Sequence, residues 1–253
     1  MKITILTLFE DFFDYFVNTS IIKRAIDKKL VEVEVINFRN YSTDKLKRVD
    51  DGPFGGGAGM IIKLQPIVDC LKAIKTENSK VYLLSASGKK YNQQMAHELS
   101  TINHLILICG HYEGIDARIE NYIDGEICIG DYILTGGEIA AMAVADSIIR
   151  LIDGTINNES TKEESFENGL LEYPQYTTPR VYDNIAVPDI LFSGNHQEIE
   201  KYRFKQSIIK TKENRPELID INSFSKKQMK WYQELNDNQD EQKAIKKAKK
   251  FMK

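Results

Sequence analysis

Short apolar runs alternate with amphipathic segments over the first 150 residues. Lys2–Phe9 and Val31–Phe38 predict buried strands, and the amphipathic stretch between them predicts short helices. Three more strands are predicted at Lys80–Ser85, Leu105–Cys109 and Glu126–Ile129, and three more helices at Pro66–Ile74, Gln93–Leu99 and Ile139–Ile149. Because parallel strands need crossover helices between them, this order predicts an α/β fold built on a parallel sheet.

After Arg150 the pattern changes. Asp153–Asn168 is polar and acidic, which is typical of a mobile linker between domains. Beyond it the pattern predicts a helix at His196–Ile209, another that begins at Ser223 or Ser225, and a lysine-rich helical tail over residues 242–253. We therefore predict a first domain over residues 1–153, a linker over 154–172 and a helical domain over 173–253.

Composition narrows the class of protein. The chain has 253 residues, 42% of them hydrophobic, and no apolar stretch long enough to span a membrane. Cys70, Cys109 and Cys128 lie inside apolar runs and form no CxxC pair, which favours buried thiols in a reducing, cytoplasmic environment. The four histidines are scattered along the chain and indicate no metal site.

The charge is unevenly distributed. The net charge is −3, but residues 173–253 hold 16 Lys and Arg against 11 Asp and Glu, so this third carries +5 and the remainder −8. A basic C-terminal third indicates where a polyanion would bind. The same charges also suit the solvated face of an ordinary helix, and charge alone does not separate the two interpretations.

A glycine-rich segment, DDGPFGGGAGM, covers residues 50–60 and predicts a shaped loop that another backbone, a base or a phosphate can approach closely. It is not a Walker A loop, because no Gly-Lys-Ser/Thr follows it, and a nucleotide hydrolase is therefore disfavoured. A second candidate is the turn predicted at Ala86–Lys90, which would end a strand at the sheet edge where open α/β folds bind ligands.

The richest segment covers residues 104–150. It contains two glycine turns, Gly110–Gly114 and Gly130–Gly137, each directly after a predicted strand. Turns that follow two parallel strands lie on one edge of the sheet, where their main-chain groups can recognise an adenine edge or a ribose without charged side chains. The Ala- and Met-rich helix that follows suits close packing against another helix or subunit, and equally suits the core.

Five motifs, in their order and spacing, resemble those of the bacterial tRNA (guanine-N1)-methyltransferases: DDGPFGGGAGM, CGHYEGIDARI, IGDYILTGGE, ESFENGLLEYPQYTTP and FSGNHQEIEKYRFKQS. The resemblance extends from about Lys2 to about Leu218. It implies a SPOUT-type α/β domain with a deep C-terminal trefoil knot, a rare exception to the rule against threaded chains. It also implies a homodimer with active sites at the subunit interface, which transfers a methyl group from S-adenosyl-L-methionine to N1 of guanosine 37 in tRNA.

The resemblance assigns binding residues position by position. The cofactor-binding residues, mostly through their backbone, would be Leu83, Leu84, Ser85, Ala86, Gly110, Tyr112, Glu113, Gly114, Ile129, Gly130, Asp131, Tyr132, Ile133, Leu134, Gly136 and Gly137. The substrate-binding residues would be Asp50, Gly55, Gly56, Gly57, Ser193, Gly194, Asn195, His196, Arg203 and Lys205. In the family Mg2+ aids methyl transfer, but no carboxylate cluster in this sequence identifies its ligands.

The resemblance also implies two catalytic residues. Arg150 would stabilise the negative charge that develops on guanine O6, although an arginine at a helix end can equally offset the helix dipole. The general base would be Glu164, where the family usually has aspartate immediately before Ser-Phe. Its carboxylate can accept the N1 proton, but the longer side chain changes the geometry. Glu163 is an alternative base, and both residues also fit a solvated acidic linker.

Two rival functions stay open at this point. The glutamate at position 164 would suit an RNA-binding dimer that has lost methyl transfer. A knotted methyltransferase could also act on a different RNA.

Overall fold

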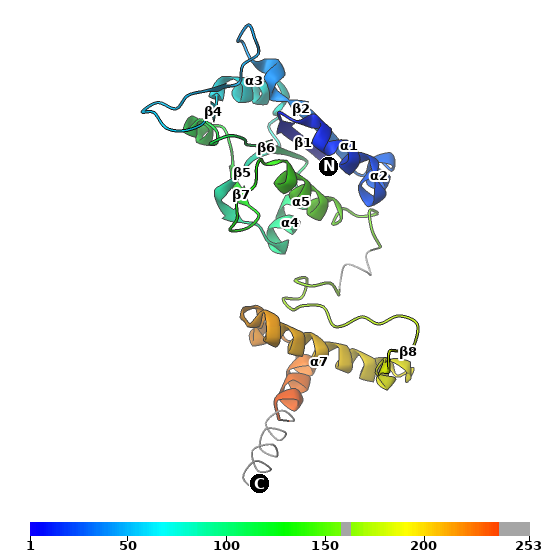
Figure 1. Ribbon diagram of the computed structural model, residues 1–253. Helices are drawn as coiled ribbons and strands as arrows, with labels where there is room; N and C mark the ends of the chain where they lie inside the picture. The colour runs from blue at the N-terminus through cyan, green and yellow to red at the C-terminus, as the bar shows by residue number, and fades with distance from the viewer. Residues whose placement is uncertain (158–162, 238–253) are drawn as a thin grey trace. The chain divides into compact units, whose positions relative to one another are not determined.

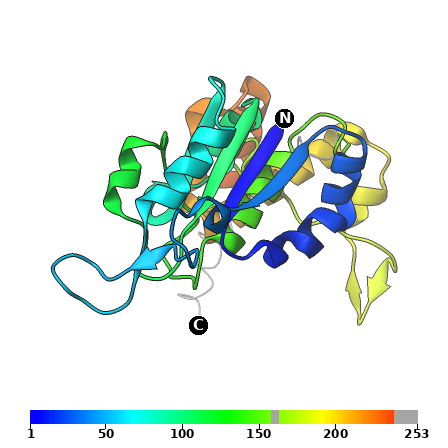
Figure 2. The ribbon, with the colours of Figure 1, turned by 90° about the horizontal axis from the view of Figure 1, so that it is seen from above.

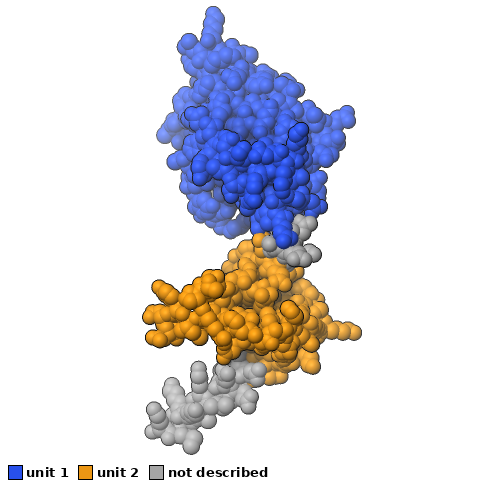
Figure 3. Space-filling view, turned by 90° about the vertical axis from the view of Figure 1, so that its right-hand side faces the viewer, with its two compact units in different colours: residues 1–158 blue, residues 159–253 orange. Residues whose placement is uncertain are grey.

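The computed structural model describes residues 1–157 and 163–237. The chain forms two compact units, Met1–Asn158 and Glu159–Lys253, which we describe separately (Figures 1 and 3). Part of the predicted linker, at residues 158–162, and the predicted lysine-rich tail lie outside the described residues. Within the described ranges no helix is long and apolar enough to cross a membrane.

The first unit contains a five-stranded sheet with the order β2-β1-β6-β5-β7, in which all neighbouring strands are parallel (Figures 1 and 2). Its strands are β1 (Lys2–Thr7), β2 (Glu32–Asn37), β5 (Ser79–Lys90), β6 (His104–Cys109) and β7 (Gly125–Cys128). The predicted α/β fold with a parallel central sheet is thereby confirmed.

Helices cover both faces of this sheet. One face is covered by α2 (Ser20–Asp27), α4 (Gln93–Ser100) and α5 (Glu138–Ile149), and the other by α3 (Leu64–Ile74), η2 (Phe38–Tyr41) and η3 (Ala117–Asn121). Within β6, Leu105 and Leu107 belong to the first core, whereas Ile106 and Ile108 belong to the second. Because successive side chains of a strand point to opposite faces, a continuous apolar run serves both cores. Two short elements, η1 (Glu10–Phe13) and α1 (Asp14–Asn18), follow β1.

The turn predicted at Ala86–Lys90 is wrong, because β5 continues through these residues. Leu84 pairs with Ile127 of β7, and after a register shift Lys89 pairs with the same residue. Gly88 lies so close to β7 that a Cβ atom there would come within 2.6 Å of the carbonyl carbon of Glu126. The residues between Leu84 and Lys89 bulge from the strand, and β5 then resumes its pairing with β7 at Lys89 and Lys90.

The glycine-rich segment forms the loop of a short hairpin. β3 (Asp50–Asp51) pairs antiparallel with β4 (Ile61–Ile62). Gly55, Gly56 and Gly57 have φ values of 88°, 78° and 140°. Because residues other than glycine rarely adopt positive φ angles, these glycines allow the loop to take this shape.

The second unit is centred on α7 (His196–Asn214) and a helix over residues 226–237. α7 buries Phe204, Ser207, Ile208 and Thr211, whose spacing of three, four and seven residues places them on one face of the helix. Phe204 and Ile208 pack against Leu170 and Trp231. The remaining short helices are η4 (Asp189–Phe192), η5 (Pro216–Leu218) and η6 (Ile221–Ser223).

Hydrogen bonds identify Ser225, not Ser223, as the residue that begins the helix over 226–237. The Ser225 hydroxyl accepts a hydrogen bond from Gln228 N at 3.2 Å, and the Gln228 side chain accepts one from Ser225 N at 2.9 Å. This reciprocal pair is a capping box, which satisfies backbone donors at the helix end.

The second unit is not helical throughout, because the segment before α7 includes two short strands. This segment contains the hairpin of β8 (Val181–Tyr182) and β9 (Ile185–Ala186). Asp183 and Asn184 form its two-residue turn with φ values of 50° and 59°. Two left-handed residues match the twist of paired strands, and Asp and Asn tolerate that conformation.

The buried His104 of β6 makes the stability of the first unit depend on pH. Thr4 Oγ1 lies 2.9 Å from its Nε2 atom, and Ser79 Oγ lies 2.8 Å from its Nδ1 atom. Burial, aided by the positive charge of Lys2 and opposed by Glu34 and Glu32, holds the pKa of His104 below its ordinary value of 6.5. The unfolded chain therefore binds more protons than the folded one as the pH falls below 6.5, and the free energy of unfolding decreases.

We expect His104→Gln to reduce the loss of stability between pH 7 and pH 5, because the side chain that titrates is gone. Hydrogen exchange of β6 amides, corrected for the intrinsic rate at each pH, measures the opening free energy of this unit. An identical pH dependence in the wild-type and variant proteins would contradict this assignment.

Candidate active site

A cavity of about 440 Å3 lies at the carboxyl edge of the sheet in the first unit. Its walls come from the ends of β5, β6 and β7 and from the two glycine turns, Gly110–Gly114 and Gly130–Gly137. Every residue predicted to bind the cofactor lines this cavity, with the exception of Asp131. The Asp131 side chain is 84% exposed and forms an ion pair with Lys90 at 3.1 Å.

The two glycine turns are hydrogen-bonded to each other. Gly137 N donates to Gly110 O at 2.9 Å. A Cβ atom at Gly137 would lie 2.7 Å from the Cα atom of Cys109, which is closer than real side chains come. Glycine at this position therefore allows the turn after β7 to reach the end of β6 and close the cavity.

A buried carboxylate anchors this arrangement. Glu138, the first residue of α5, is buried, and its Oε1 atom accepts a hydrogen bond from Thr7 Oγ1 at 2.6 Å. Its Oε2 atom lies 2.7 Å from Nε2 of His111, whose ring stands 4.6 Å from that of Phe9. The helix N-terminus adds a favourable dipole for the carboxylate. These contacts tie the end of β1 and the turn after β6 to α5.

Sequence reasoning missed both His111 and Glu138. They stand in the motifs GHYEG and GGE, but their pairing depends on tertiary structure and has no signal in spacing. Cys109, which lies beside them, is inert: complete burial and the negative charge of Glu138 raise the pKa of its thiol well above the ordinary value of 9.0. A thiol held in its protonated form is a poor nucleophile.

The lining of the cavity is apolar and acidic. Glu113, Glu120 and Glu126 contribute carboxylates, and the described residues that line the cavity include neither Lys nor Arg. The hydroxyl of Ser87 donates to Glu126 Oε2 at 2.5 Å. This lining suits a ligand with apolar parts and a positive charge, and it disfavours a phosphate.

The glycine-rich hairpin adjoins the cavity. Glu113 N donates to Met60 O at 3.0 Å, and Ile62 N donates to Gly114 O at 2.9 Å. Asp50 pairs with Ile62 in the hairpin that carries Gly55, Gly56 and Gly57. The structure thus places these predicted substrate-binding residues on a segment that is attached to a wall of the cavity.

Arg150 does not line the cavity of its own chain. It ends α5, where its backbone N donates to Asp146 O at 3.0 Å. α5 has 12 residues and begins at the cavity. A helix of that length extends about 18 Å, so Arg150 lies at the far end of α5 from the cavity.

The second unit brings Glu164 together with His196 and Arg203 around a cavity of about 260 Å3. Glu163 also lines it, and its Oε2 atom accepts a hydrogen bond from the Tyr173 hydroxyl at 2.5 Å. The same oxygen lies 3.8 Å from Nη1 of Arg203. Glu163 is therefore held by two neighbours, one of them cationic.

The other predicted substrate-binding residues lie on and just before α7. Asn195 caps this helix by accepting a hydrogen bond from Glu198 N at 3.3 Å, and Ser193 Oγ accepts one from Asn195 N at 3.2 Å. Gly194 between them has a φ of 69°.

Lys205 has a partner within the second unit. Together with Lys201 it forms ion pairs with Glu234, at 3.0 Å and 2.8 Å, which lower the pKa of Glu234 to about 2. These pairs attach the helix over 226–237 to α7.

No group of three metal-ligating side chains occurs among the residues that the structure describes.

Comparison with known proteins identifies the family. Residues 1–221 match the family described as tRNA (Guanine-1)-methyltransferase TrmD. A tRNA (guanine-N(1)-)-methyltransferase of Malacoplasma penetrans is 61% identical over 219 residues, which cover 87% of this chain and 97% of the relative. Proteins of the same description from Clostridium botulinum (strain Hall) and Staphylococcus haemolyticus are 49% and 48% identical, and cover 93% and 87% of this chain and 99% and 91% of the relatives. The chain therefore belongs to the tRNA (guanine-N1)-methyltransferase family.

Proposed function

We propose that this protein transfers a methyl group from S-adenosyl-L-methionine to N1 of guanosine 37 in tRNA. The observation that carries the proposal is the cavity between the two glycine turns, in a chain whose relatives are tRNA (guanine-N(1)-)-methyltransferases over almost their whole length. The first unit would bind the cofactor, and the second unit, whose residues 173–253 carry a net charge of +5, would bind the tRNA.

The cavity fits the cofactor chemically. S-adenosyl-L-methionine supplies an activated methyl group on a positively charged sulfur. Glu113, Glu120 and Glu126 provide negative charge for that cation, and no described lining residue is Lys or Arg. The backbone of the glycine turns that line the cavity, Gly110–Gly114 and Gly130–Gly137, would hydrogen-bond an adenine edge and a ribose.

The predicted trefoil knot belongs to the same proposal. Lys89 and Lys90 pair with Ile127 and Cys128, and Tyr91 N donates to Cys128 O at 2.8 Å. The chain before α4 therefore holds the strand end from which the turn Gly130–Gly137 departs, and this turn is bonded to Gly110. These interlocked contacts support a threaded path.

Glu164 is the proposed general base and Arg150 the proposed electrostatic stabiliser. The Glu164 carboxylate would remove the proton from guanine N1, while the Arg150 guanidinium would stabilise the negative charge on O6. We favour Glu164 over Glu163 because Glu164 stands immediately before Ser165-Phe166, the position at which the family usually has aspartate. The use of Mg2+ stays a prediction without assigned ligands.

We further propose that each active site combines two chains. Arg150 lies about 18 Å along α5 from the cavity of its own chain. It would therefore act at the corresponding cavity of a second copy of the chain. Large apolar side chains around that cavity are exposed, among them Tyr112, Tyr132 and Ile133, which is 85% exposed. Such residues suit a symmetric interface between two copies.

We predict that Glu164→Ala lowers methyl transfer roughly 100-fold to 10,000-fold, the usual contribution of a general base. The measurement uses labelled S-adenosyl-L-methionine and a tRNA transcript with guanosine at position 37. Glu164→Asp shortens the stem but keeps the carboxylate, so it should retain most of the activity.

Two controls accompany this assay. Glu163→Ala should stay close to the wild-type rate, and a transcript with adenosine at position 37 should accept no methyl group. Near-normal turnover by Glu164→Ala would refute the base assignment. A wild-type protein that binds the tRNA but transfers nothing would favour the non-catalytic alternative.

We predict that two inactive variants restore activity when they are mixed. Arg150→Ala removes the stabilising cation, and Ala86→Arg fills the cavity with a bulky, positively charged side chain. If Arg150 serves the cavity of the partner chain, each mixed dimer has one intact site, and random exchange gives about a quarter of the wild-type activity.

Methyl transfer is measured before and after the two homodimers are mixed and allowed to exchange. Arg150 acting on its own chain would leave both sites of the mixed dimer defective. Activity no higher than the mean of the separate variants would therefore contradict the shared site.

A further inference from the structure

A second pocket in the second unit, about 410 Å3 in volume, is distinct from the cavity that contains Glu164. We call it the aromatic pocket and define it by Tyr173, Tyr176, Arg180, Phe192 and Arg203. None of its lining residues belongs to α5 or to the glycine turns, and of the residues discussed so far as substrate-binding it includes Arg203 alone.

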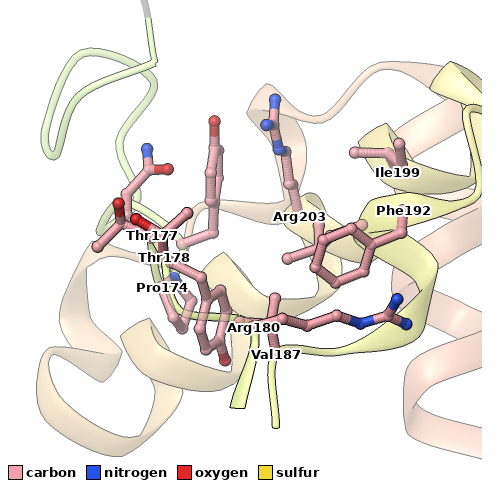
Figure 4. Close-up of a pocket in the computed structure, with 12 residues that line it drawn as sticks. Pro174, Thr177, Thr178, Arg180, Val187, Phe192, Ile199 and Arg203 are labelled. Carbon is pink, nitrogen blue, oxygen red and sulfur yellow. The ribbon is translucent and has the colours of Figure 1, made fainter. Parts of the chain in front are cut away.

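Both arginines of the aromatic pocket stack on aromatic rings. The guanidinium carbon of Arg180 lies 4.1 Å from the centre of the Phe192 ring, and that of Arg203 lies 4.7 Å from the centre of the Tyr173 ring. Figure 4 shows Arg203 between Phe192 and the side of the pocket formed by Thr177 and Thr178. A stacked guanidinium is held in one orientation and remains a flat, charged donor for phosphate or for the edge of a base.

The charge of Arg203 is weakly compensated. Glu163 lies 3.8 Å away, and the buried Nε atom of Arg203 has no hydrogen-bond partner among the described residues. Arg180 donates from Nη2 to Asp189 at 2.8 Å, which leaves its other donors for a ligand. The pocket therefore offers two cations, and no described residue of its lining is acidic.

Two aromatic rings in the same pocket are open to a ligand. Tyr176 is 46% exposed and Phe192 is 50% exposed, although both rings are large enough to anchor a core. Half-exposed rings beside arginines are typical of proteins that bind single-stranded nucleic acid, where each ring stacks with an unpaired base. The hydroxyls of Thr177 and Thr178 can hydrogen-bond the edge of such a base.

The aromatic pocket shares a wall with the cavity that contains Glu164. Tyr173, Ile199 and Arg203 line both. A nucleotide bound in the aromatic pocket would therefore lie beside the cavity that contains Glu164. The next nucleotide of the same RNA could then approach Glu164, with Arg203 between the two.

We propose that the aromatic pocket binds one unstacked base of the substrate RNA, from a nucleotide adjacent to the methylated guanosine. Tyr176 and Phe192 stack with the base, and Arg203 contacts the phosphate that connects it to the target nucleotide. The inference rests on the proposed function, since it takes the RNA and the position of the target from it. Holding the neighbouring base offsets the cost of unstacking the loop and presents guanine N1 to the proton acceptor.

The test measures binding of a labelled anticodon stem-loop RNA to the full chain by fluorescence anisotropy. Phe192→Ala and Tyr176→Ala should each weaken binding about 5-fold to 100-fold, the usual effect of losing one base–aromatic stack. Tyr176→Phe keeps the ring and should bind almost as well as the wild type. Tyr182→Ala, which removes a 75% exposed tyrosine outside the pocket, is the matched control and should leave binding unchanged.

A series of RNAs with one abasic nucleotide at each loop position identifies the bound base. Loss of that base should weaken wild-type binding at least as much as Phe192→Ala does, and the two losses should not add when combined. Additive losses at every position, or equal binding by Phe192→Ala and the wild type, would overturn the inference. Failure of the proposed function is distinguishable, because the wild-type protein would then bind the RNA without methylating it, whatever the state of the pocket.

Discussion

The hydrogen bond from Gly137 N to Gly110 O is the contact on which the candidate site depends most. It requires the backbone after β7 to come against the end of β6, where a Cβ atom would have no room. Both turns leave the same edge of a parallel sheet, so their free main-chain groups face one cavity. A pocket built in this way can recognise a nucleoside by geometry and leaves its side chains to supply charge and apolar surface.

The buried pairing of Glu138 with Thr7 and His111 makes this geometry rigid. Burying a carboxylate without partners costs several kcal/mol, and here each of its oxygens has a partner from a different element. The proposed chemistry is arranged differently. Glu164 belongs to the second unit, and Arg150 stands at the far end of α5. In the proposed function the first unit holds the cofactor, and the proposed proton acceptor and stabilising cation belong to other parts of the chain.

The sequence predicts the parts of this structure that local patterns determine. Apolar runs predict the strands of the parallel sheet, and the glycine turns after two of them indicate where a cavity forms. The continuation of β5 through Lys90 is missed because its residues show no apolar pattern and gain strand pairing from β7. The pairing of His111 with Glu138, 27 positions apart, and that of Lys205 with Glu234, 29 positions apart, depend equally on tertiary packing. The family resemblance suggested catalytic roles for Arg150 and Glu164. Only the structure shows that Arg150 is separated from the cavity of its own chain.

The most direct test of the central claim is hydrogen exchange measured by mass spectrometry with and without S-adenosyl-L-methionine. If the cavity between the glycine turns binds the cofactor, exchange slows in peptides that cover Leu83–Ala86, Gly110–Gly114 and Ile129–Gly137 and is unchanged in α7. Ala86→Arg, which fills the same cavity, should abolish this protection. Cofactor binding that leaves the exchange of both glycine turns unchanged, or that protects the second unit instead, would contradict the account.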